Sequence, residues 1–428
     1  MDQNALTIVA PIKPNQTAEL TAFLNQIGTN LRHNPYLDIS HLLTTHFLRW
    51  VILTSDDTGP DRLLFESNHD GDTSDYLQDF LAQAGLAVDA IYAYCIGYPV
   101  AGISDKDAVL AYLLEHSIPY EAFYIGYRGR SAATVKAALA ARESLAQFID
   151  AAQSRRAFDG LSDAQIWDAI QAEAARQDIT PIAPQKSGTP VFYGLAAGIG
   201  LAVLLKKPRI GLPLLALLGG FAAFLRWRET RDAQKWQQEE RAKYLPSYAS
   251  HIAANELARR EDILAQNQLT HVVKLRPGLF RRFTIKAVLG TINLLAKIVF
   301  NKGNLGGIPT IHFARWVLLD DGHLVFFSNY DGSWDNYLGD FVDRAANGLT
   351  GVWSNTQDFP PTRFLLWDGA RAIELFKAWT RAHQVPTQVW YSAYPDNTVV
   401  NIRDAVQTLE NLGQTPTPQT LPGWLRRL

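Results

Sequence analysis

The chain has 428 residues, more than the roughly 100–200 of one domain, and its 47% hydrophobic and 11% aromatic residues exclude a disordered protein. A formal net charge of −2 excludes recruitment of nucleic acid by a global positive field, so we expect no nucleic-acid partner. Cys95 is the only cysteine, which excludes an intrachain disulfide framework.

The first 150 residues alternate between strand and helix patterns. The patterns predict a strand at residues 6–12, a helix at 17–32, a β-hairpin at 45–53 and 62–68, helices at 73–92 and 105–115, a strand at 119–127 and a helix at 132–149. The order β-α-β-β-α-β is that of the ferredoxin-like split unit, so residues 1–150 are predicted to form a first ferredoxin-like module.

The middle of the chain is predicted to contain a membrane-associated hairpin at residues 190–227, between a helical linker at 151–189 and a helical connector at 228–267. Residues 190–205 and 210–225 carry no charge and flank a basic turn. A helix of that length, about 24 Å, falls short of a hydrocarbon core of about 30 Å, so spanning is marginal. We expect a transmembrane or embedded hairpin, with the modules on the cytoplasmic side. The alternative is a buried hairpin or an oligomer interface in a soluble protein.

The apolar stretch from Phe280 to Phe300 is interspersed with basic residues. This pattern predicts a helix that lies at an anionic membrane surface, with membrane lipid as the partner. The same stretch is by position the first helix of a second module, where one face packs on a sheet in any case. Both interpretations are open.

The second module, residues 268–428, is a diverged copy of the first. His46–Val51 returns as His312–Val317, and Ser67–Gly71 returns as Ser328–Gly332, with order and spacing kept beyond these matches. The predicted fold class is therefore α+β, with two tandem ferredoxin-like modules related by pseudo-two-fold symmetry and an inserted apolar helical hairpin.

The repeated motifs carry the candidate site residues. On a regular strand neighbours alternate faces, so His46 and Arg49 are expected on opposite faces, as are His312 and Arg315. Asp70, in the run Asn68-x-Asp70-Gly71, has two interpretations, which apply equally to its counterpart in the second copy. It is either the cap of the following helix or part of a polar site at the sheet edge.

At these residues the chain resembles the dye-decolorising peroxidases of the dimeric α+β-barrel superfamily, which carry a Gly-x-x-Asp-Gly motif. The resemblance implies haem as cofactor, Asp331 or Asp70 as the proton-transferring acid, and Arg315 or Arg49 as its partner in polarising peroxide. The remaining candidates are binding residues: Asn329, Asn68, His312 and His46. Serine replaces the first glycine of the motif in both copies, and the motif assigns no histidine to the iron and no other metal ligand.

Three classes of function compete. The leading expectation is a membrane-associated, barrel-like protein with peroxidase-like redox chemistry. The alternatives are a lipid-binding protein and a non-catalytic membrane-surface scaffold that self-associates as a homo-oligomer. Whether the protein is an enzyme is left open.

Overall fold

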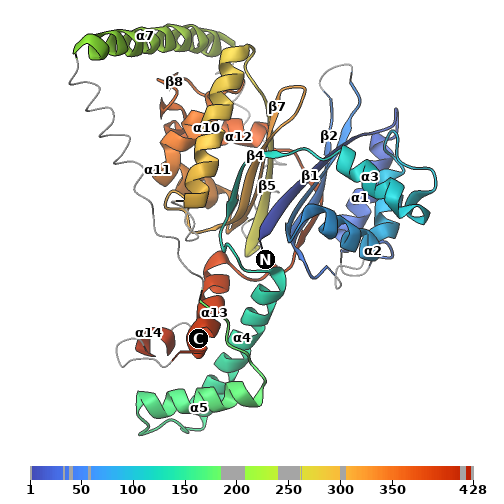
Figure 1. Cartoon of the computed structure of the whole chain (residues 1–428), viewed down its shortest axis with the longest axis vertical. Coiled ribbons are helices and arrows are strands. Elements are labelled where there is room, and N and C mark those ends of the chain that lie inside the picture. The colour runs from blue at the N-terminus through green and yellow to red at the C-terminus, as the bar shows by residue number, and fades with distance from the viewer. Residues whose placement is uncertain are drawn as a thin grey trace. The chain divides into compact units, whose positions relative to one another are not determined.

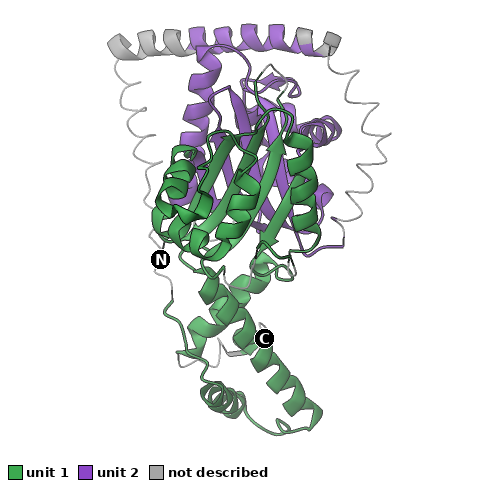
Figure 2. Ribbon diagram, turned by 90° about the vertical axis from the view of Figure 1, so that its right-hand side faces the viewer, with its two compact units in different colours: residues 1–119, 125–186, 386–428 green, residues 120–124, 187–385 purple. Residues whose placement is uncertain are grey.

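The computed structural model describes residues 2–31, 34–37, 42–55, 59–184, 208–239, 261, 263–298, 305–414 and 421–425. The chain divides into two compact units, shown in different colours in Figure 2. Unit 1 consists of residues 1–119, 125–186 and 386–428, and unit 2 of residues 120–124 and 187–385. Neither unit is one continuous stretch of chain.

Unit 1 is built on a four-stranded antiparallel sheet. Its strand order is β1 (Gln3–Pro11), β3 (Arg62–Asp70), β2 (Thr45–Leu53) and β10 (Thr387–Ser392). Three of these strands belong to the first sequence repeat, and β10 comes from the second.

Helices cover the apolar face of this sheet. They are α1 (Thr17–Thr29), α2 (Thr73–Tyr92), the 3-10 turn η2 (Gly102–Ser104) and α3 (Lys106–Glu115). In the core, the ring of Trp50 from β2 lies 4.8 Å from that of Phe65 and 6.3 Å from that of Phe80 on α2. A second group of helices in unit 1 contains α4 (Ala132–Ser154), α5 (Asp163–Arg176), α13 (Val399–Leu412) and α14 (Leu421–Leu425), with α4 crossing α13 (Figure 1).

Unit 2 contains the equivalent sheet of the second repeat. Its strand order is β4 (Tyr120–Ile125), β6 (Ile311–Leu318), β7 (His323–Asp331) and β5 (Gln266–Lys274). Its helices are α7 (Pro208–Glu239), α10 (Leu279–Ile298), α11 (Trp334–Trp353) and α12 (Ile373–Ala382), with the 3-10 turn η3 (Gly369–Arg371). A short hairpin joins β8 (Thr362–Arg363) to β9 (Trp367–Asp368).

The two sheets exchange their fourth strands. The last strand of the first repeat, β4, pairs at the edge of β6 in the sheet of the second repeat, and β10 pairs with β2 in the sheet of the first. The predicted α+β class with antiparallel sheets is confirmed. The exchange was not predicted, because local periodicity indicates a strand but not its neighbour.

The predicted transmembrane helix is wrong. No helix in the described parts of the chain combines the length and apolar character needed to cross a bilayer. The second apolar arm is the start of α7, and the charged later half of this helix packs on the rest of unit 2. The Glu229 carboxylate accepts hydrogen bonds from the backbone N–H groups of Phe364 (2.7 Å) and Leu365 (2.6 Å). The Trp236 indole donates to the backbone carbonyl of Asp358 (3.0 Å). The first arm, residues 190–205, lies outside the described residues.

Cys95 is expected to resist thiol reagents in the folded protein. It is fully buried, and burial raises the pKa of its thiol to about 12. Because only the thiolate is nucleophilic, labelling by a disulfide reagent at pH 8 should be about a thousandfold slower than for free cysteine, and should become fast in denaturant. Absorbance of the released thiol follows both rates. Fast labelling of folded protein would contradict this burial.

Candidate functional site

A β-bulge in each copy changes the direction of the histidine that both repeats share. Thr45 is opposite His69 and Phe47 is opposite Asn68, so His46 is the extra residue on β2. The same shift occurs on β6 at His312. The expectation that His46 and Arg49 lie on opposite faces is therefore wrong, because it assumed a regular strand.

The bulges bring each histidine to the aspartate of its own repeat. His46 Nε2 lies 3.0 Å from Asp70 Oδ1, and His312 Nε2 lies 2.6 Å from Asp331 Oδ1. Neither aspartate caps the following helix: Asp72 caps α2, and Ser333 caps α11. Of the two interpretations of these aspartates, helix cap or polar site, the structure favours the polar contact.

In unit 1 the His46–Asp70 pair extends into a buried chain of hydrogen bonds. The second carboxylate oxygen of Asp70 accepts from the backbone N–H of Ala132 (2.7 Å), and His46 Nδ1 lies 2.6 Å from the Tyr394 hydroxyl. That hydroxyl lies 2.5 Å from the hydroxyl of Tyr127. Burial raises the pKa of Tyr394 well above its ordinary value, so its phenol stays protonated.

Arg49 and Arg315 have different surroundings in the two copies. The Arg49 Nε donates to Glu66 (2.8 Å), and the amide of Asn68 donates to the other oxygen of that carboxylate (2.6 Å), all fully buried. In the second copy Phe327 takes the place of Glu66 in the register, and the Arg315 guanidinium lies 5.6 Å from its ring centre. Asn329, the counterpart of Asn68, is also buried.

The residues assembled in unit 1 do not fit a haem peroxidase site. Both oxygens of Asp70 and both ring nitrogens of His46 are engaged within the protein, and Arg49 is held by Glu66. To contact a peroxide or bind iron, these side chains would have to break their buried contacts. That would leave buried charges unpaired, at a cost of about 3–5 kcal/mol. We therefore derive no step through haem.

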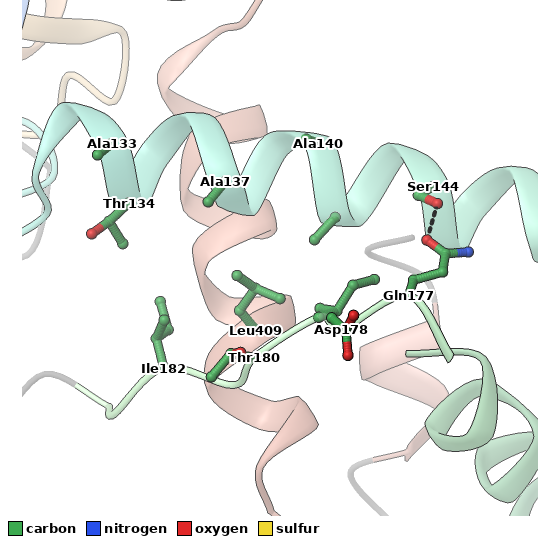
Figure 3. Close-up of a pocket in the computed structure, with 12 residues that line it drawn as sticks. Ala133, Thr134, Ala137, Ala140, Ser144, Gln177, Asp178, Thr180, Ile182 and Leu409 are labelled. Carbon is green, nitrogen blue, oxygen red and sulfur yellow. Dashed lines mark hydrogen bonds between the residues drawn. The ribbon is translucent and has the colours of Figure 1, made fainter. Parts of the chain in front are cut away.

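Unit 1 has an open groove along α4. Its cavity volume is about 670 Å³, and its walls are small side chains of α4, the segment 177–182 and Leu409 of α13 (Figure 3). A hydrogen bond between Ser144 and Gln177 closes one end. Among the described residues that line the groove, no buried polar side-chain atom lacks a partner, so nothing there identifies a ligand.

Unit 2 has a smaller cavity of about 350 Å³ between α10 and α11. Its walls include the apolar residues Ile292, Leu295, Leu305, Trp316, Phe341 and Leu349. Trp316 is 3% exposed, and its indole N–H has no hydrogen-bond partner among the residues that the structure describes. Such a donor in an apolar wall is costly unless an acceptor reaches it, by about 1–3 kcal/mol.

The residues at equivalent positions of the first copy differ from those around Trp316. In unit 1 the counterpart of Trp316 is Trp50, whose indole lies near the hydroxyl of Tyr92, although its N–H also has no hydrogen-bond partner among the described residues. By position in the two helices, Tyr92 is replaced by Trp353 in the second copy, which offers no acceptor. Sequence analysis missed Trp316. Comparing the two copies position by position could have identified it.

The same comparison explains the open space and its charged mouth. In unit 1 Ile103 packs against Gly85, so closely that a Cβ there would lie 2.6 Å from its Cγ1. The counterpart of Ile103 is the much smaller Ala370. The mouth of the unit 2 cavity carries Arg344 and Arg371, which replace Gln83 and Ser104 of the first copy.

Comparisons with known proteins give no match: no family model, no curated protein and no solved structure is similar to this chain.

Proposed function

We propose that this protein binds an acidic amphiphile, a medium-chain carboxylic acid, in the cavity of unit 2. This develops the lipid-binding alternative. The observation that carries it is Trp316, a buried indole donor without a partner in the wall of an apolar cavity. A carboxylate oxygen of the ligand would accept from this N–H, a charge-assisted bond that is stronger than one between neutral groups.

The walls of the cavity suit an alkyl chain. They are aliphatic and aromatic, and each methylene group moved from water into such surroundings contributes about 0.8 kcal/mol. A volume of about 350 Å³ lies at the lower end of the range for small-molecule sites, roughly 300–1,000 Å³. A medium-length chain is therefore favoured over a long one.

The mouth of the cavity favours a negative head group. Arg344 donates to the Gly307 carbonyl (3.0 Å) and Arg371 to the Asn347 side chain (3.3 Å), which hold both guanidinium groups beside the opening. Asp343 also lines the cavity and opposes an anion in part. Because Arg344 is also paired with Asp340 (3.6 Å), Arg371 is the guanidinium group that supplies most of the attraction for a carboxylate ligand.

This proposal includes a finer interpretation of the fold. We interpret each unit as a ferredoxin-like module whose fourth strand is supplied by the other repeat. The order of elements along each repeat, β-α-β-β followed by helices and a last strand, is the support for it. The ligand would lie on the helical side of the second module, above Trp316.

The test is calorimetric titration of decanoate into the full-length protein. Trp316→Phe should weaken binding about tenfold or more, because it removes one hydrogen bond to a charged group, worth roughly 1.5–3 kcal/mol. Arg371→Gln should weaken binding of decanoate but not of decanol. Ala346→Leu, which fills the cavity, should abolish both.

Trp50→Phe is the matched control, since it makes the same change in unit 1 and should leave affinity unchanged. Melting temperatures of all variants show whether they fold. Equal weakening by Trp50→Phe and Trp316→Phe, or unchanged affinity in Ala346→Leu, would place the ligand elsewhere and overturn the proposal.

A further inference from the structure

An exposed patch of aromatic, aliphatic and basic side chains lies where α7 meets the start of α10 in unit 2. We call it the α7–α10 patch. Its large apolar members are Phe221 (50% exposed), Phe224 (40%), Trp227 (56%), Leu279 (86%) and Phe283 (74%). Its basic members are Arg228, Arg231, Arg282 and Lys286.

Side chains of the patch contact one another. The ring of Phe224 on α7 lies edge to face with that of Phe280 on α10, with centroids 5.6 Å apart, where the two helices meet in Figure 1. The Arg228 guanidinium lies over both rings, at 6.0 and 5.2 Å from their centres. Arg231 lies 5.0 Å from the ring centre of Trp227. The basic and aromatic groups therefore face the same side.

The other side of α7 is the one that packs on unit 2. Leu225, Glu229 and Trp236 are buried there, at the spacing of one helix face. The exposed rings of Phe224 and Trp227 on the same helix are therefore not part of the core. A cluster of exposed apolar side chains on a protein surface is typical of an interaction site.

We infer that the α7–α10 patch docks on the surface of an anionic lipid bilayer, without crossing it. Charge complementarity selects this occupant. Asp232 on α7 is bonded to Arg281 (2.7 Å) and Arg276 (3.3 Å), Glu229 is bonded to Arg226 (2.9 Å), and within the described parts of the chain Lys286 has a distant partner in Glu121 (3.9 Å).

Basic groups attract acidic head groups, while exposed aromatic rings insert at the level of the head groups. The uncharged run at residues 210–225 of α7 is too short to span a bilayer, so the contact that we infer lies at the bilayer surface. This inference does not depend on the ligand proposed for the cavity.

The experiment is sedimentation of the full-length protein with vesicles of phosphatidylcholine alone or mixed with phosphatidylglycerol. We expect binding to the mixed vesicles that weakens with salt, and little binding to phosphatidylcholine. The double variant Arg282→Gln with Lys286→Gln should bind the mixed vesicles about tenfold more weakly or worse, given the loss of two charges near the surface. Phe283→Ser should weaken binding at every salt concentration.

The matched control is Lys106→Gln with Arg155→Gln, which removes one lysine and one arginine exposed in unit 1 and should bind as the unaltered protein does. Ala346→Leu, which fills the cavity, should also bind vesicles normally, so the two proposals fail separately. The inference would be overturned if the protein bound phosphatidylcholine vesicles as well as mixed vesicles, or if it bound neither. It would also be overturned if the control variant lost as much binding as the Arg282→Gln, Lys286→Gln variant. If the protein instead self-associates without binding vesicles, and Phe283→Ser abolishes that association, the patch binds a second copy of the chain.

Discussion

Glu66→Leu is expected to lower the free energy of unfolding by about 3–5 kcal/mol, the largest effect that we predict for a single substitution. Glu66 accepts from Arg49 and from Asn68, and all three side chains are buried. Removing the carboxylate leaves the Arg49 guanidinium without that counter-charge in the interior, where it cannot lose its proton. Urea denaturation followed by circular dichroism measures the change.

The double variant Arg49→Met with Glu66→Leu separates the charge from the packing. Because it removes both ions and keeps comparable side-chain volumes, it should recover most of the stability lost in Glu66→Leu. A double variant as unstable as the sum of the two single variants would show that the two residues do not act as a pair.

His271→Ile is expected to make the protein more resistant to acid. His271 lies on β5 of unit 2, between the rings of Trp353 (4.9 Å) and Trp379 (4.7 Å), and no hydrogen bond to its imidazole is found within the described parts of the chain. Burial, together with the nearby His383, holds the pKa of His271 well below its usual range. The folded protein therefore keeps this imidazole neutral.

The sign of the effect follows from the two states. Below about pH 6.5 the unfolded chain binds a proton at His271 and the folded chain does not, so stability falls as pH falls. The contribution is at most about 1.4 kcal/mol for each pH unit, or roughly 2.7 kcal/mol between pH 6.5 and 4.5. Isoleucine is the natural replacement, because Ile8 occupies the equivalent position opposite Phe65 in the first copy.

Denaturation midpoints at pH 8, 6.5, 5.5 and 4.5 test this prediction. The difference between the two proteins at pH 8 reports packing alone and serves as the control, since neither state is protonated at this residue there. A difference that stays constant down to pH 4.5 would contradict a buried neutral His271.

Much of the local structure could be predicted from the sequence. The helix predicted at 73–92 is α2 with the same bounds, and the strand predicted at 45–53 is β2. Apolar periodicity and polar caps lie within a few residues of each other, so they report local conformation directly. The internal repeat likewise showed that the chain contains the same arrangement twice.

The candidate site could be predicted only in part. His46 and Asp70 were both identified, but their contact depends on a bulge at the histidine, which only the pairing of β2 with β3 reveals. In the first copy, the residues that the resemblance implies for haem chemistry are engaged in other buried contacts. Trp316 was missed, because an indole without an acceptor is a property of its neighbours and not of its own position.

By itself, then, the sequence determined the α+β class, the repeat and most helices and strands, because these depend on contacts between residues near one another in the chain. The tertiary structure decided the exchange of β4 and β10, the neutral burial of His271, the cavity above Trp316 and the packing of the later half of α7 on unit 2. Each of these depends on which distant segment supplies a neighbour, and the free energy of that choice comes from packing and hydrogen bonding that no local pattern encodes.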